Sequence, residues 1–444
     1  MPLPLRAIIP HEREYYVEPS LLLVLLLFGL LVLRVPVAVS LALSAFATLF
    51  FYEGGSVIQL IAQRMYPVTR SWVLLAIPFF MLAGTIMEMG GLTRRIVNFS
   101  NALVGFLPGG LAAVTVVASM IFGGVSGSSS AETSALGSIL IPAMKEQRYA
   151  PRFAAALVAS SACIGMIIPP SIPMVLWSFV SGESLGKLFM AGLIPGILIG
   201  LIQIGICVVI AQKRGYGIRR PFSTAELGRT AGDGLLTLVT PLIIIGGIVF
   251  GFFTPTEAAI IAVFYSLFLS MVVYKELRLC DLPAVCLKAG TTSAMVLFIV
   301  AGSSLFSYAL TVMEVPALLT AKLLVFGSTP LSFILITGIL YIILGMIMDI
   351  SVIILLTGPI LAPLIARVGL DPIQTAMIYM VILAVGLVTP PVGMDLFVAS
   401  GISGLPIEEI AKECVVFVFG MLLVAAIIWF VPATALWLPA RVNF

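Results

Sequence analysis

Residues 165–171 read GMIIPPS and residues 386–391 read GLVTPP, so two consecutive prolines interrupt an apolar segment at two places in the chain. Each proline lacks an amide hydrogen and disfavours helix in the residue before it. Neither segment can remain one continuous helix. We therefore expect the carbonyls of Gly165 to Ile168 to lack intrahelical partners, and the hydroxyl of Thr389 to add an oxygen at the second break.

The two breaks belong to an internal repeat. Pro169 recurs as Pro390, 221 positions later, and other glycines and prolines recur at the same offset. The set Gly124, Gly137, Pro142, Pro151, Gly165, Pro169 and Pro170 pairs with Gly345, Gly358, Pro363, Pro372, Gly386, Pro390 and Pro391. Chance does not account for seven coincidences at one offset, so the sequence predicts a duplicated unit of about half the chain.

The composition assigns the chain to the membrane. Of its 444 residues 61% are hydrophobic and 10% are charged, and the mean hydropathy is +1.21. A soluble protein could not bury so much apolar surface. The apolar runs at 21–33, 73–87 and 415–431 are continuous, which indicates helices and not the alternating strands of a barrel. Net charge is +3, which gives no sign of nucleic-acid binding.

Polar and Gly/Pro breaks divide the chain into two repeats. We expect a polar tail at 1–19, a first repeat at 20–211, a basic loop at 212–234, a second repeat at 235–438 and a tail at 439–444. Each repeat contains an interrupted segment (109–144 and 331–364) and a Pro-Pro-broken helix (152–181 and 372–403). The other helices are expected near 20–34, 36–52, 71–89, 187–211, 235–252, 255–274, 289–313 and 411–438, with an amphipathic stretch at 90–107.

The interrupted segments are predicted to be re-entrant hairpins. Leu111–Phe122 precedes the first turn and would form ~18 Å of helix, against a hydrocarbon core of ~30 Å. A hairpin leaves the membrane on the side where it enters, so five ordinary crossings remain in each half. Because five is odd, the halves should have inverted topology. The fold class is therefore an all-α polytopic membrane protein with two inverted repeats.

Basic residues predict the orientation. One side holds Arg34, Arg94, Arg95, Lys145, Arg148, Arg152, Lys213, Arg214, Arg219, Arg220, Arg229, Lys275, Arg278, Lys288 and Lys412. The other side holds only Arg6, Arg13, Arg64, Arg70, Lys187, Lys322, Arg367 and Arg441. The richer side is predicted to be cytoplasmic, which places the N-terminus in the periplasm. Met1–Pro19 shows no cleavable signal pattern, so the transmembrane helices are expected to direct insertion.

The first hairpin turns within Gly123–Ser130, a run of small residues and hydroxyls. Its carbonyl and serine oxygens suit Na⁺, and the N-terminus of the following half-helix favours an anion. The alternative is that small residues only allow close helix packing. Because a Pro-Pro break follows each hairpin at the same distance, we predict two symmetry-related ion sites.

Intramembrane acids are costly and each one requires an explanation. Asp349, at the second hairpin tip, could bind a cation or cap the helix at Ile350–Leu364. Asp395, four residues after the second break, could contact substrate or an ion, or make a structural hydrogen bond. Glu132 lies in the first turn after the serines, where the helix dipole favours a capping role.

No stretch of the sequence predicts an enzyme. The five cysteines have no metal or redox spacing, the single histidine is His11, and no nucleotide-binding loop or nucleophile–base pair is found. Residues 254–257, TPTE, have the pattern of a helix N-cap followed by proline and then glutamate, so Glu257 is assigned to structure. No organic cofactor is expected.

Four motifs together resemble a known family. Residues 124–129 (GVSGSS), 168–173 (IPPSIP), 253–259 (FTPTEAA) and 386–393 (GLVTPPVG) are similar to those of the large membrane (M, DctM-like) subunit of tripartite ATP-independent periplasmic (TRAP) transporters. The resemblance extends from Leu21 onward. It implies an elevator-type member of the ion transporter superfamily in the bacterial inner membrane, related to divalent anion/Na⁺ symporters.

The resemblance also implies a function. It predicts Na⁺-coupled uptake of organic anions, such as dicarboxylates and sialic or other sugar acids, delivered by a periplasmic substrate-binding (P) protein. A small four-helix membrane (Q) subunit would complete the complex. Two alternatives are a stand-alone divalent anion/Na⁺ symporter or exchanger, and a membrane scaffold or channel without coupled transport.

Matching the motifs residue by residue assigns the sites. The first Na⁺ site would comprise Ser126, Ser128, Ser129, Gly165 and Ile168. The second would comprise Gly345, Met348, Gly386, Val388 and Thr389. The candidate substrate residues are Ser128, Ser130, Ser171, Asp349 and Asp395. The chain has Ser130-Ala131-Glu132 where many relatives have Pro-Ala-Thr, and Met394-Asp395 where many have Leu-Asn, so two added acids leave a zwitterionic or less charged substrate open.

Overall fold

The computed structural model describes residues 19–54, 57–217, 223–315 and 329–441, and those residues form helices and loops with no β-strand. The all-α prediction is confirmed. The expected N-terminal tail lies almost wholly outside the described residues, as do Arg219, Arg220 and Lys322. The first half of the chain contains α1 (Pro19–Val32), α2 (Val37–Glu53), α3 (Val57–Val68), α4 (Ala76–Met89), α5 (Leu92–Val104), α6 (Gly110–Ser126), α7 (Ser129–Glu146), α8 (Pro151–Ala162), α9 (Ile172–Ser181) and α10 (Leu185–Arg214).

The second half contains α11 (Thr224–Val249), α12 (Pro255–Phe268), α13 (Leu282–Val312), α15 (Pro330–Gly345), α16 (Ile350–Arg367), α17 (Pro372–Leu387), α18 (Met394–Ser403), α19 (Ile407–Phe430) and α20 (Ala433–Leu436). Short non-α turns lie at Cys163–Met166, Leu269–Val273, Leu279–Asp281 and Pro439–Arg441. Within the part of the chain that the structure describes, five spans are long and apolar enough to cross a membrane: Leu185–Arg214, Pro255–Val273, Leu279–Val312, Ile350–Arg367 and Ile407–Phe430.

The helix bounds repeat with the same offset as the glycines and prolines. Helices α7 and α16 both have 18 residues, and Ser129 and Ile350, where they begin, are 221 positions apart. Helices α8 and α17 begin at Pro151 and Pro372, again 221 apart, and each has proline in the first turn. The repeated prolines therefore coincide with the starts of α8 and α17.

Each interrupted segment forms two helices joined by a short tip, α6–α7 and α15–α16. Helix α6 has 17 residues, or ~26 Å, and α15 has 16, or ~24 Å, so both are short of a hydrocarbon core of ~30 Å. The sequence placed the end of the first arm at Phe122, but α6 continues to Ser126. Gly123 and Gly124 stay helical because they pack against the first Pro-Pro break and Pro241.

The expected Pro-Pro breaks are present. After α8 the backbone tightens into a 3₁₀ turn at Cys163–Met166, and α9 begins at Ile172 with Ser171 as its N-cap. After α17 the chain passes Pro390 and Pro391 before α18 begins at Met394. The carbonyl of Met166 was expected to lack an intrahelical partner, and it accepts a hydrogen bond from the side-chain Oγ of Ser171.

Three stretches differ from the sequence map. Helix α3 was not expected, because Gln59, Gln63 and Arg64 interrupt its apolar pattern. Its contacts with α13 stabilise it, including a hydrogen bond from Ser304 Oγ to the carbonyl of Arg64 at 3.1 Å. Helices α11 and α13 begin 11 and 7 residues earlier than expected, at Thr224 and Leu282. The amphipathic stretch forms α5, bent by 72° from α4.

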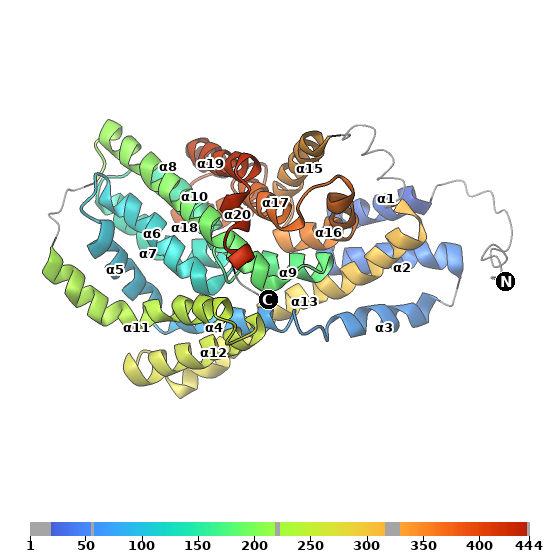
Figure 1. Cartoon of the computed structure of the whole chain (residues 1–444), viewed down its shortest axis with the longest axis horizontal. Coiled ribbons are helices and arrows are strands. Elements are labelled where there is room, and N and C mark those ends of the chain that lie inside the picture. Colours follow the sequence, from blue (N-terminus) through green and yellow to red (C-terminus); the bar gives the residue numbers. More distant parts are fainter. Residues whose placement is uncertain (1–18, 55–56, 218–222, 316–328, 442–444) are drawn as a thin grey trace.

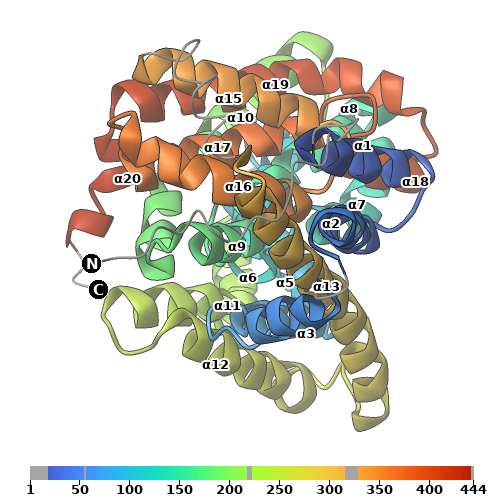
Figure 2. The same ribbon diagram turned by 90° about the vertical axis from the view of Figure 1, so that its right-hand side faces the viewer.

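The repeats pack together around α9 and α17. Helix α9 lies near the centre in both views, beside α16 (Figures 1 and 2). In Figure 1, α1–α3 lie toward one end of the longest axis, and α5 and α11 lie toward the other. Trp177 of α9 contacts Tyr379 of α17 with ring centroids 5.7 Å apart, and Tyr379 contacts Tyr341 of α15 at 4.7 Å. Buried aromatic pairs of this kind stabilise a core by about 0.5–1.5 kcal/mol each beyond the area that they bury.

Candidate functional site

The first hairpin tip packs against the first Pro-Pro break. Gly127 has φ +63°, and its carbonyl accepts a hydrogen bond from the amide of Ile172 at 3.2 Å. A Cβ on Gly123 would lie 2.3 Å from the Cα of Gly165, so the two backbones are in direct contact. The first tip and the first break are therefore in contact through Gly123 with Gly165 and through Gly127 with Ile172.

The second tip packs against the second break in the same way. A Cβ on Gly345 would lie 2.9 Å from the Cα of Gly386. The amides of Val392 and Gly393 both donate to the carbonyl of Met346, at 3.1 and 3.2 Å. Each hairpin tip is thus held by the broken helix of its own repeat.

The two tips face each other across a cavity of about 320 Å³, which we call the tip cavity. Its walls come from Gly127–Ser130 at the first tip and from Asp349–Ser351 at the second. Helix α13 adds a third wall through Thr292 and its neighbours. Ser128 and Asp349 are the N-caps of α7 and α16, so the N-termini of two half-helices meet at the tip cavity.

Two further cavities adjoin the tips. One of about 420 Å³ lies beside the second tip and is lined by Met348, Asp349 and residues of α1, α2 and α13. The other, of about 330 Å³, lies beside the first tip and contains Lys288, so we call it the Lys288 cavity. Its polar lining consists of Thr85, Glu88, Ser126, Ser128, Ser130, Ser134, Lys288 and Thr292.

Of the five residues predicted for the first Na⁺ site, the three serines line a cavity and the other two do not. Ser126 is 5% exposed and its Oγ has no hydrogen-bond partner, and Ser128 Oγ lies 3.4 Å from Ser130 Oγ. Ser129 lines the tip cavity, but its hydroxyl donates to Asp395. Gly165 and Ile168 are buried behind the tip, outside the cavity linings.

In the second predicted set, Met348 lines the cavity beside the second tip. Gly345, Gly386 and Val388 are buried at the contact between tip and break. The hydroxyl of Thr389 donates to the carbonyl of Val385 at 2.6 Å, which leaves its oxygen lone pairs free to accept or coordinate.

Of the five candidate substrate residues, Ser128, Ser130 and Asp349 line the tip cavity. Ser171 and Asp395 do not, since both have 0% exposure. Ser171 Oγ donates to the carbonyl of Met166 and accepts from the amide of Met174, so it caps α9. Asp395 accepts from Ser129 Oγ at 3.2 Å and lies 3.6 Å from Cys163 Sγ, which is the structural hydrogen bond considered from the sequence.

The other acids also have defined positions. Asp349 Oδ1 accepts from the amide of Ser351 at 2.8 Å, so it caps α16 while it lines the tip cavity. Glu132 is fully buried in the first turn of α7, and its carboxylate makes no hydrogen bond that caps the helix, so the expected capping contact is not formed. Glu257 completes the predicted capping box, accepting from the amide of Thr254 at 2.8 Å.

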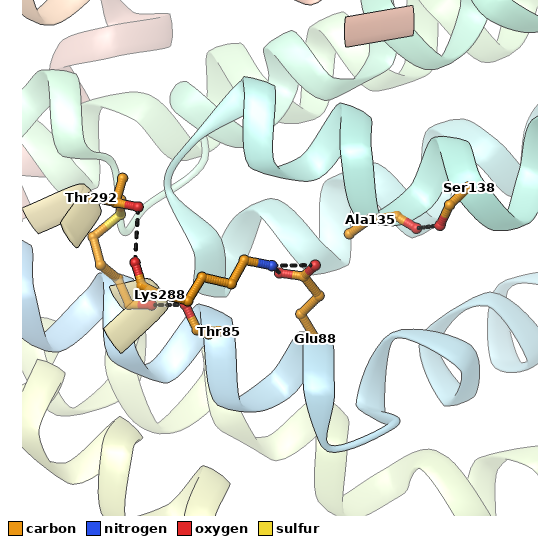
Figure 3. A network of polar contacts seen from close by, with 7 residues as sticks. Thr85, Glu88, Ala135, Ser138, Lys288 and Thr292 are labelled. Carbon is orange, nitrogen blue, oxygen red and sulfur yellow. Dashed lines mark hydrogen bonds and ion pairs between the residues drawn. The ribbon is translucent and has the colours of Figure 1, made fainter. Parts of the chain in front are cut away.

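Sequence reasoning missed the contribution of α13. Thr292, Met295 and Ile299 line the tip cavity, and Lys288 of the same helix binds both carboxylate oxygens of Glu88 at 2.8 and 2.9 Å (Figure 3). The i, i+4, i+7, i+11 spacing of these four residues defines one helix face, which is a usable signal once the helix is known. The sequence map began this helix at residue 289, so it left Lys288 outside.

Comparisons with known proteins agree with this architecture. The family model for the tripartite ATP-independent periplasmic transporter, DctM component, matches residues 24–434. The chain is 39% identical over 400 residues to the C4-dicarboxylate TRAP transporter large permease protein DctM of Pseudomonas aeruginosa, covering 90% of this chain and 93% of that protein. It is 36% identical to the sialic acid TRAP transporter large permease protein SiaM of Vibrio cholerae, covering 93% and 96%.

One other relative and one solved structure add context. The isethionate TRAP transporter permease protein DctMQ of Oleidesulfovibrio alaskensis is 38% identical, and the match covers 94% of this chain and 66% of that protein. The crystal structure of the YdaH transporter of Alcanivorax borkumensis superposes with a TM-score of 0.60 at 14% identity, covering 94% and 99% of the two chains, so the folds are alike. The chain is a multi-pass membrane protein that belongs to the family of TRAP transporter large permease subunits, and it is not an enzyme.

Proposed function

We propose that the chain is the substrate-translocating subunit of a secondary transporter that couples Na⁺ entry to the uptake of organic anions across the bacterial inner membrane. The observation that carries this proposal is the pair of hairpin tips, one from each repeat, that line a single cavity. The N-termini of α7 and α16 meet there, and half-helix N-termini favour a carboxylate. Such a cavity between repeats is where secondary transporters place their substrate.

Na⁺ is the proposed coupling ion. At each tip, carbonyl and hydroxyl oxygens lie close to a broken helix, which is the donor set that hard cations prefer. The first site would use Ser126, Ser128, Ser129, Gly165 and Ile168, and the second would use Gly345, Met348, Gly386, Val388 and Thr389. Binding of the cations would stabilise the tips and offset the negative charge of the incoming anion.

The substrate class and the partners follow from the relatives' names. C4-dicarboxylate and sialic acid carry carboxylates, and isethionate carries a sulfonate, so an organic anion is the shared class. A periplasmic binding protein would deliver it. This chain matches 66% of the relative named DctMQ, which leaves length for a small membrane subunit in that protein and supports such a partner here.

The contacts between distant helices support the proposed orientation. Glu413 binds Arg214 at 2.8 Å and Arg152 at 3.2 Å, and all three flank segments that the basic residues place on one side. That side would be cytoplasmic. An elevator movement of the hairpins and broken helices against the remaining helices would then expose the tips to each side in turn.

Uptake into liposomes tests the proposal. The chain would be reconstituted with the small subunit and binding protein of its own bacterium and supplied with radiolabelled succinate or N-acetylneuraminate. We expect accumulation only with an inward Na⁺ gradient, and none when K⁺ or choline replaces Na⁺ at the same membrane potential. Accumulation without a Na⁺ gradient would contradict Na⁺ coupling. Uptake without the binding protein would favour a stand-alone symporter, and linear, non-saturating flux would favour a channel.

A further inference from the structure

One face of α13 forms a wall shared by the tip cavity and the Lys288 cavity. Lys288 lines the latter, Thr292 lines both, and Met295, Val296 and Ile299 line the former. These positions follow the i, i+4, i+7, i+8, i+11 spacing of a single helix face. At ~1.5 Å of rise per residue, the face extends roughly 16 Å from Lys288 to Ile299.

The two cavities meet at the first hairpin tip. Ser128, Ser130 and Thr292 belong to the linings of both. An anion that left the tips on this side would therefore pass two serine hydroxyls before it reached the ammonium group of Lys288. Thr85 and Ser134 add further hydroxyls to the Lys288 cavity, so its wall offers hydrogen-bond donors as well as charge.

Lys288 carries the positive charge of this region. It is the single Lys or Arg among the described residues that line the tip cavity and the two cavities beside the tips. Figure 3 shows the ion pair; the Lys288 side chain is 53% exposed and that of Glu88 is 29% exposed, so neither partner is enclosed by the protein. Exposed pairs of this kind are weakly held, and an anion can therefore compete with Glu88 for the ammonium group.

Building on the proposed function, we propose that Lys288 is a specificity-determining residue that binds the carboxylate of the transported anion in the Lys288 cavity after the anion leaves the hairpin tips. Glu88 holds the ammonium group in place when no anion is present and competes with the anion for it. Lys288 lies at the end of α13 that the basic residues place in the cytoplasm. The contact therefore belongs to release into the cell.

The test measures how anion inside the liposome affects uptake. Binding protein is added outside only, so the measured uptake comes only from transporters whose periplasmic side faces outward. The labelled anion is succinate or N-acetylneuraminate, whichever the wild type accumulates, and the same unlabelled anion is varied inside. The readout is the internal concentration that gives half of the maximal effect on uptake, through product inhibition or exchange, with the external KM measured in parallel.

We expect Lys288→Gln to raise the internal half-effect concentration by about tenfold, as for the loss of one charge-assisted hydrogen bond, and to leave the external KM unchanged. Lys288→Arg should restore it. Glu88→Gln should lower the internal half-effect concentration, because the carboxylate that competes for Lys288 is gone. Arg95→Gln and Glu276→Gln break a comparable ion pair of 2.6 Å that lies outside these cavities, and both should leave the value unchanged.

The opposite signs separate this role from a structural one. If the ion pair only stabilises the fold, Lys288→Gln and Glu88→Gln should act in the same direction and on both sides of the membrane. Effects of the same direction in the two variants would overturn this proposal but not the proposed function. The same holds if Lys288→Gln leaves the internal half-effect concentration unchanged, or if internal anion does not affect uptake by the wild type. A wild type that accumulates neither anion would contradict the proposed function, and this proposal with it.

Discussion

Ser129 and Asp395 join the two repeats across 266 positions of sequence, through a hydrogen bond from the serine Oγ to the carboxylate Oδ1 at 3.2 Å. Ser129 begins α7 in the first hairpin, and Asp395 lies in the first turn of α18 after the second Pro-Pro break. Both residues are buried. The bond therefore ties the first tip to the second broken helix, and we expect these two elements to move as one body.

Removing the donor should destabilise the protein. Ser129→Ala leaves a buried carboxylate oxygen without its partner, which costs about 1–3 kcal/mol and should lower the melting temperature. Ser130→Ala, at a neighbouring position that lines the tip cavity, is the matched control and should change the melting temperature little. In a double-mutant cycle with Asp395→Asn, the coupling should be about 0.5–3 kcal/mol. Strict additivity would show that the bond contributes nothing.

The contact between Gly345 and Gly386 should tolerate no side chain. A Cβ on Gly386 would lie 2.7 Å from the Cα of Gly345, and a backbone atom cannot move aside as a flexible side chain can. Gly386→Ala should therefore cost about 1–3 kcal/mol, measured by thermal unfolding.

Gly246→Ala is the control for this substitution. Gly246 lies within α11, and a Cβ there would meet nothing within 4 Å. The change should be neutral or should stabilise by about 0.4–1 kcal/mol, because alanine restricts the unfolded chain. Equal melting temperatures for the two variants would contradict the close contact.

Glycine and proline carried most of the correct fold prediction. Proline at 151 and 372 and the Pro-Pro pairs act on the local backbone, so their effect on helix bounds is readable without tertiary information. Helix α3 was missed because its polar residues hide its pattern, and its position depends on packing against α13. Gly123 and Gly124 read as a turn, but contact with Gly165 and Pro241 keeps them helical.

The site was predictable where local chemistry decides it. Asp349 is the N-cap of α16, which is one of the two roles that the sequence offered for it. Ser128 lies at the N-cap position of α7, a role that the sequence analysis did not assign to it. Asp395 and Ser171 were correctly placed beside a Pro-Pro break, but only the folded chain shows that they point away from the tip cavity. Lys288 was not identified, because a lysine at a helix end reads as a topology signal until its neighbours in space are known.

Asp349 is expected to act as a helix cap and not as an ion ligand. Its Oδ1 is committed to the amide of Ser351 at 2.8 Å. Asp349→Asn keeps a capping oxygen and removes the charge, so it should preserve both the melting temperature and the stabilisation by Na⁺. Asp349→Ala loses the cap and should cost about 1 kcal/mol. A Na⁺ effect that disappears in Asp349→Asn would identify the carboxylate as a ligand instead.

Na⁺ itself should raise the melting temperature of the purified protein above that in K⁺ or choline. A ligand that binds only the folded state adds about 2.7 kcal/mol at a hundredfold Kd. Ser128→Ala and Thr389→Ala should each reduce the Na⁺ effect, because each removes one proposed ligand oxygen. Ser138→Ala is the control for both, since Ser138 lies within α7, the helix that Ser128 caps; Figure 3 shows Ser138 beside Ala135.

Ser138 suits this purpose because its hydroxyl already donates to the carbonyl of Ala135 at 2.9 Å and lines none of the three cavities. Its removal changes helix stability without touching a tip, so the difference between Na⁺ and choline should stay at the wild-type value. If Ser128→Ala and Ser138→Ala reduce the difference equally, the loss reflects general destabilisation. If the wild type melts at one temperature in all three salts, the cation sites are wrong, and coupling to another ion must be sought.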